Sequence, residues 1–86
     1  MSDEDIAQEI VRQLSRRAAD SSICPSEVAR ALASDEAAWR ALMPRVREVA
    51  AALRERRCVR ITQGRVDVLS DDLHRGAIRL SRGPDF

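Results

Sequence analysis

The sequence predicts a single α+β domain, a winged helix-turn-helix, and three observations support this prediction. The chain has 86 residues, the size of one small domain. Three segments have the apolar spacing of amphipathic helices. The last third alternates in polarity around a Gln-Gly pair, as a β-hairpin does. Three helical faces and one sheet face in this order close a small core. We place the domain at residues 4–82 and expect residues 83–86 to form a flexible tail.

The first helix is expected over residues 4–18, where apolar residues recur every three or four positions. Acidic residues near its start and arginines near its end both stabilise the helix dipole. Ser2 or Asp3 can cap its N-terminus. Ile23 follows a turn, and we expect it to form a short bridge to the sheet.

A second, short helix is expected from Cys24 to near Ala33. Pro25 occupies the first helical position and Glu27 stands three residues past the cap, so the segment has the layout of a capping box with Cys24 in place of Ser or Thr. A helix N-terminus would stabilise a thiolate. No base lies near Cys24 in the sequence, so we expect it to be a buried structural cap.

The third helix is marked by apolar residues that recur at helical spacing from Trp39 to Leu53. Pro44 interrupts this run, and a proline inside a helix removes a backbone donor. We therefore expect a short helical turn at 35–42 and a main helix at 44–57, with Pro44 in its first turn. Trp39 is expected to fill the core between the second and third helices.

Short strands are expected in the last third of the chain. Residues 59–62 and 66–69 alternate in polarity around a turn at 63–65. Residues 70–72 can cap a one-turn helix ahead of a last short strand at 77–80. Either later strand can pair with residues 59–62, and the sequence leaves both alternatives open.

Charge is segregated along the chain, although the formal net charge is only +1. Residues 40–65 contain eight Arg and two Glu, whereas residues 1–39 contain four Arg and eight acidic residues. Such segregation favours a polyanionic partner, here duplex DNA. The candidate DNA contacts lie in or beside the third helix and at the hairpin turn: Arg45, Arg47, Arg54, Arg56, Arg57 and Arg65. Arg60 and Arg79 also lie on or near the predicted wing.

The outer face of the third helix favours an alternative partner. Glu48 and Glu55 stand at the centre of this face and would repel phosphates. The small side chains of Ala51 and Ala52 could instead seat another helix. The alternative to DNA binding is therefore a protein-interaction module that forms a homodimer or binds a protein partner through this face.

The sequence contains no catalytic or metal-binding pattern. Two cysteines and one histidine cannot supply a spaced zinc motif, and the glycines form no nucleophile elbow or phosphate loop. We expect no enzyme activity, no cofactor and no metal. With no signal peptide and no membrane-length apolar run, we expect a cytoplasmic protein without a membrane partner.

Four short segments carry a further signal. They are ICPSEVARAL at 23–32, WRALM at 39–43 followed by Val46-Arg47, ITQG at 61–64, and GAIRL at 76–80. In these segments the chain resembles a small bacterial family known only as a domain of unknown function. The resemblance covers roughly residues 6–82 and implies an uncharacterised winged-helix protein. It implies no activity and no residue roles.

Overall fold

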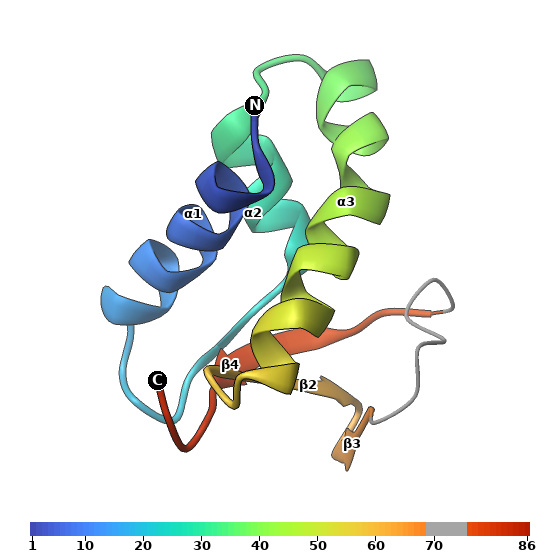
Figure 1. The fold of residues 1–86 in the computed structure, drawn as a ribbon. Helices are drawn as coiled ribbons and strands as arrows, with labels where there is room; N and C mark the ends of the chain where they lie inside the picture. The colour runs from blue at the N-terminus through green and yellow to red at the C-terminus, as the bar shows by residue number, and fades with distance from the viewer. Residues whose placement is uncertain (69–75) are drawn as a thin grey trace.

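The structure, a computed structural model, describes residues 1–68 and 76–86. Three helices lie over one face of a four-stranded antiparallel sheet (Figure 1). The elements are α1 (Asp3–Ser15), β1 (Ser22–Ile23), α2 (Pro25–Leu32), α3 (Glu36–Glu55), β2 (Val59–Gln63), β3 (Val66–Asp67) and β4 (Arg79–Arg82). This α+β arrangement is compatible with the predicted winged helix-turn-helix. Within the described residues, no helix combines the length and the apolar character needed to cross a membrane.

The sheet has the strand order β1-β4-β2-β3. β2 pairs with β4 on one side, with Ile61 opposite Leu80, and with β3 on the other. Both later strands that the sequence predicts therefore pair with β2. The predicted bounds of the last strand were wrong: β4 begins and ends two residues later, because Arg82 pairs with Val59 at the start of β2. The expected one-turn helix falls on residues 69–75, outside the described part of the chain.

A complete capping box begins α1. The Ser2 Oγ accepts a hydrogen bond from the Asp5 N–H at 3.2 Å, and the Asp5 carboxylate accepts one from the Ser2 N–H at 2.9 Å. The bond from the Ser2 backbone lowers the pKa of Asp5. The predicted cap is thus confirmed, with Ser2 as the capping residue and α1 starting at Asp3.

Hydrogen bonds connect the C-terminal end of α1 to the sheet. The helix ends at Ser15, before the predicted end at residue 18. The guanidinium of Arg82 donates hydrogen bonds to the carbonyl oxygens of Leu14 and Arg17, each at 3.1 Å. The Leu14 carbonyl also accepts a hydrogen bond from the Arg17 N–H, and the bonds from Arg82 connect β4 to the end of α1.

The predicted capping box of α2 is confirmed. The Glu27 carboxylate accepts a hydrogen bond from the Cys24 N–H at 2.7 Å. The Ser26 hydroxyl lies 3.2 Å from the Cys24 Sγ. Cys24 and Cys58 are both half-buried free thiols. Cys24 is therefore the N-cap residue of α2, but it is half-buried and not buried as expected.

The prediction of a separate helical turn at 35–42 was wrong, because α3 is continuous and contains Pro44. Asp35 caps this helix by accepting a hydrogen bond from the Ala38 N–H at 2.8 Å. Pro44 removes one backbone donor, but it lies on the exposed face, where water can bind the carbonyl that loses its partner. The helix continues because four buried residues follow the proline: Val46, Val49, Ala50 and Leu53.

The core consists of hydrophobic residues from every helix and from three strands. It comprises Ile6, Ile10, Leu14, Ile23, Val28, Ala29, Val46, Val49, Ala50, Leu53, Val59, Ile61, Ile78 and Leu80. Trp39 was expected to fill this core, but it is only half-buried and packs against the core edge. The Arg30 guanidinium lies 4.5 Å from the centroid of its ring. Trp39 therefore covers the core between α2 and α3.

The last residues of the chain contact the α3–β2 connection. The Gly83 N–H donates to the Cys58 carbonyl, and the Asp85 N–H donates to the Arg57 carbonyl, both at 2.9 Å. The Arg82 guanidinium lies 4.8 Å from the Phe86 ring centroid. The flexibility expected for residues 83–86 stays a prediction, but these residues are not without contacts.

An arginine ends α3 at a position that usually requires glycine. Arg57 has φ 63°, in the left-handed region. Its N–H donates to the Arg54 carbonyl at 2.9 Å, and the Cys58 N–H donates to the Leu53 carbonyl at 3.0 Å. This pair of bonds is a Schellman motif with Arg57 in place of glycine.

We expect Arg57→Gly to raise the free energy of unfolding by about 0.5–1 kcal/mol, because glycine adopts the left-handed conformation without a Cβ clash. Denaturant unfolding followed by circular dichroism measures this change. Arg56→Gly is the matched control, since Arg56 has φ −84° and gains nothing from glycine. A lower stability of Arg57→Gly would contradict the strain assigned to this residue.

Candidate nucleic-acid interface

The arginines predicted as DNA contacts on α3 divide between its two flanks. Arg45 and Arg56 lie on the flank beside α1. Arg45 donates to the Asp3 carboxylate at 2.9 Å and to the Met1 carbonyl at 3.2 Å. Arg56 lines a groove between α1 and α3.

Arg47 and Arg54 lie on the opposite flank of α3, and both bind backbone of the C-terminal third. Arg54 donates to the Val68 carbonyl at 2.9 Å, just after β3. Arg47 donates to the Gly76 carbonyl at 3.1 Å, ahead of β4. The Arg54 side chain is only 10% exposed. Arg54 therefore holds the fold together more than it presents charge to a ligand.

Many arginines of the 40–65 segment form ion pairs with carboxylates of the same chain. Within the described residues, five ion pairs neutralise arginines of the 40–65 segment: Arg40–Glu36, Arg45–Asp3, Arg54–Glu55, Arg57–Asp85 and Arg60–Asp67. Most of these side chains are exposed, so each pair contributes about 0–1 kcal/mol to stability. Such weak pairs can exchange for contacts with a phosphate.

One hollow gathers arginines from α3 and from the chain that follows it. Arg54, Arg57 and Arg60 line this basic hollow, which has a volume of about 370 Å³. Arg60 donates to both carboxylate oxygens of Asp67, at 3.1 and 2.9 Å. The remaining lining residues are Val59, Ile61, Val68 and Pro84. Each of these three arginines has an ion-pair partner, Glu55, Asp85 or Asp67, so a phosphate would reach them by displacing weakly bound carboxylates.

The outer face of the sheet adds a further arginine, Arg79, to those that line the hollow. Arg60 lies opposite Ser81, and Thr62 lies opposite Arg79. The residues between them on each strand are buried, so these four side chains occupy the face away from the helices. Arg79 is held by the Ser22 Oγ at 3.0 Å and the Ser22 carbonyl at 2.9 Å. Guanidinium groups and hydroxyls thus alternate on a face that no helix of residues 1–68 and 76–86 covers (Figure 1).

The turn between β2 and β3 extends the same surface. Gly64 has φ 65° and occupies the first position of a two-residue loop, as a type II′ turn favours. Arg65 follows it, is exposed, and forms no ion pair within the described part of the chain. We call Arg57, Arg60, Arg65 and Arg79, with the hydroxyls of Thr62 and Ser81, the basic face.

The outer face of α3 does not match the helix-binding site that the sequence suggests at Ala51 and Ala52. Ala51 is half-buried and packs against the core, so it is not free to receive a partner helix. Ala52 is exposed and lines the groove beside α1. Glu48 and Glu55 are exposed, as predicted. The most accessible charges on this face are therefore acidic.

The family of the chain follows from its match to a family model. That model covers residues 3–83 and is described as "Protein of unknown function (DUF3253)". This chain belongs to the DUF3253 family. No curated protein matches it. The DUF3253 match covers nearly the same residues as the resemblance noted in the sequence, and it confirms an uncharacterised family.

The candidate contacts predicted from the sequence did not include the two hydroxyls of the basic face. Thr62 and Ser81 each stand two positions from an arginine on the same strand, and this alternation could have indicated them. Their alignment across β2 and β4 required the register. Among the residues that the structure describes, no group of three or more His, Cys, Asp or Glu side chains is placed to hold a metal ion.

Proposed function

We propose that this domain is a non-enzymatic nucleic-acid-binding module that contacts the phosphates of duplex DNA with its basic face. The observation that supports this most is the alternation of Arg60 and Arg79 with Ser81 and Thr62 on an uncovered sheet face. Guanidinium groups bind phosphate oxygens in a bidentate way, and hydroxyls donate to the same oxygens. The surface therefore offers the donors that a DNA backbone needs.

The backbone conformation of Arg57 is a second observation in favour of DNA binding through the basic face. A non-glycine residue with φ 63° is strained, and glycine would end α3 at lower cost. Residues held in such conformations cluster at functional sites. The Arg57 side chain is 69% exposed and lies 3.4 Å from the Asp85 carboxylate. A guanidinium that is kept at this position despite the strain can pair with a phosphate by displacing Asp85.

Binding through the basic face has a consequence for sequence preference. The outer face of α3 presents Pro44, Glu48 and Glu55, none of which suits entry of the helix into a major groove lined by phosphates. Base readout requires side chains that reach base edges. We therefore expect contacts mainly with the backbone and only a weak preference for DNA sequence.

Fluorescence anisotropy on a labelled random duplex of about 20 base pairs tests the proposal. With about four phosphate contacts, raising the salt concentration from about 50 to about 200 mM should weaken binding about a hundredfold. A random single strand of the same length is the control for duplex preference. Absence of binding at the lower salt concentration would contradict the proposed function.

A further inference from the structure

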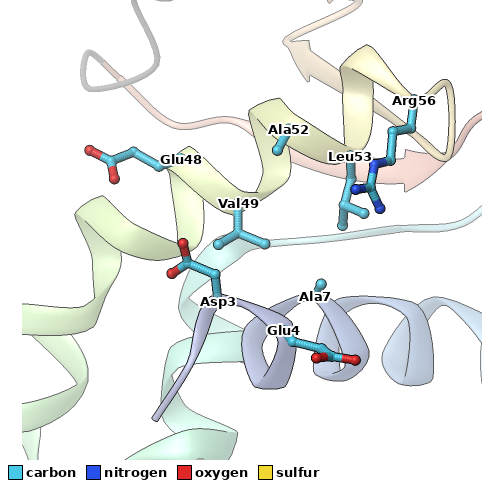
Figure 2. A pocket seen from close by; sticks show the side chains of 8 residues that line it. All are labelled: Asp3, Glu4, Ala7, Glu48, Val49, Ala52, Leu53 and Arg56. Carbon is cyan, nitrogen blue, oxygen red and sulfur yellow. The ribbon is translucent and has the colours of Figure 1, made fainter.

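A groove lies between α1 and α3 (Figure 2). Its volume is about 470 Å³. Ala7, Val49, Ala52 and Leu53 form its apolar floor, and Figure 2 shows the side chains of Asp3, Glu4, Glu48 and Arg56 around it. Val49 and Leu53 are each 7% exposed, the largest exposure in the hydrophobic core. The small side chains of Ala7 and Ala52 leave room for one large apolar side chain.

The apolar surface continues from the groove along α1. A second hollow of about 350 Å³ shares Glu4 and Ala7 with the groove and extends to Val11 and Arg12. Val11 is 38% exposed. Glu4, Ala7 and Val11 lie at spacings of three and four, so they share one face of the helix. The two hollows therefore offer two neighbouring sites for apolar side chains, as a helix-binding groove does.

The charged side chains around the groove indicate which kind of ligand can bind there. Asp3 is paired with Arg45 at 2.9 Å. Glu4 and Glu48, in contrast, make no ion pair or side-chain hydrogen bond within residues 1–68 and 76–86. Arg56 lies at the far end of the groove from Glu48 (Figure 2). The two unpaired carboxylates outnumber the single guanidinium of Arg56 beside the apolar floor, which favours a ligand that carries both apolar and basic side chains.

We propose that this groove docks a basic amphipathic helix of another protein. Two apolar side chains of that helix, about one turn apart, occupy the two hollows. A Lys or Arg of the same helix pairs with Glu4 and Glu48. This inference does not rest on DNA binding, because the groove and the basic face share none of their residues.

Two helical peptides test the docking. Both are alanine-based, carry two leucines four positions apart, and differ only in having Lys or Glu beside the leucines. We expect the lysine peptide to bind the full-length protein at least about tenfold more tightly, since the two carboxylates attract one peptide and repel the other. Amide chemical shifts of ¹⁵N-labelled protein should move at Ala7, Glu48 and Ala52.

Matched variants separate the groove from the rest of α3. Ala52→Trp fills the groove and should abolish binding of the lysine peptide, whereas Ala37→Trp, exposed on the outer face of α3, should leave it unchanged. Combining Glu4→Lys with Glu48→Lys should reverse the preference between the peptides. Circular dichroism checks that each variant is folded.

Three results would overturn the proposal. Equal binding of both peptides would remove the basis for a basic partner. Shift changes outside the groove, or none at about 1 mM peptide, would remove the docking site itself. A concentration-dependent dimer of the free protein that Ala52→Trp dissociates, measured by sedimentation velocity, would assign the groove to a second copy of this chain.

Discussion

Replacing Ile10 by alanine is expected to lower the free energy of unfolding by about 2–5 kcal/mol. Ile10 is fully buried and belongs to the core cluster that joins the helices to the sheet. Alanine removes three carbon atoms and leaves a cavity that close-packed neighbours fill only in part. Because a domain of this size is stable by only about 5–15 kcal/mol, the variant should unfold at a much lower urea concentration.

Val11→Ala is the matched control, because Val11 follows Ile10 on the same helix but is 38% exposed. Its replacement should change stability by no more than about 0.5 kcal/mol. Urea unfolding at constant temperature, followed by circular dichroism, compares the two variants. Similar effects of both replacements would contradict the assignment of the core face of α1.

The combined change Arg57→Ala, Arg60→Ala and Arg65→Ala is expected to weaken DNA binding at low salt at least about a hundredfold. With fewer phosphate contacts, fewer counterions leave the DNA when the complex forms. The slope of log affinity against log salt should therefore flatten by roughly one unit per lost contact. All three side chains are exposed. The change should therefore leave the helix content of the protein unaltered.

The control for this variant removes two arginines from the opposite flank of α3, Arg45→Ala with Arg56→Ala. Neither residue faces the basic face, so the salt slope should stay within about one unit of the wild-type value. Anisotropy titrations at several salt concentrations measure both variants. Equal flattening in the control would mean that only the total charge matters.

The parts of the fold that local signals determine could be predicted from the sequence. Ser2 and Asp5 form a capping box because both partners lie within one helical turn. Cys24 and Glu27 do the same for α2. The turn at Gly64 follows from the conformational freedom of glycine. None of these features depends on residues far away in the chain.

The prediction of a helix break at Pro44 was wrong because the effect of this proline depends on tertiary contacts. The loss of one backbone hydrogen bond favours a break, and the sequence contains that signal. The burial of Val46 and Leu53 on the same side of α3 favours continuity, and it is measurable only in the folded chain. Packing therefore outweighs the local preference, as it often does for helices.

The candidate site could be predicted only in part, because its geometry depends on long-range pairing. Arg45 meets Asp3 across 42 positions, and Arg47 meets Gly76 across 29. The count of arginines in residues 40–65 cannot separate these held side chains from the exposed Arg65. The register between β2 and β4, which sets the spacing of Arg60 and Arg79, likewise exists only after folding.

Chemical-shift mapping with an unlabelled duplex of about 12 base pairs at low salt tests the central claim most directly. The account predicts that amide shifts of ¹⁵N-labelled protein change at residues 57–65 and at 79–82. Glu48, Ala52 and Glu55 on α3 should remain unchanged in the same titration. Shift changes concentrated at these three α3 residues, or no change anywhere, would contradict DNA binding through the basic face.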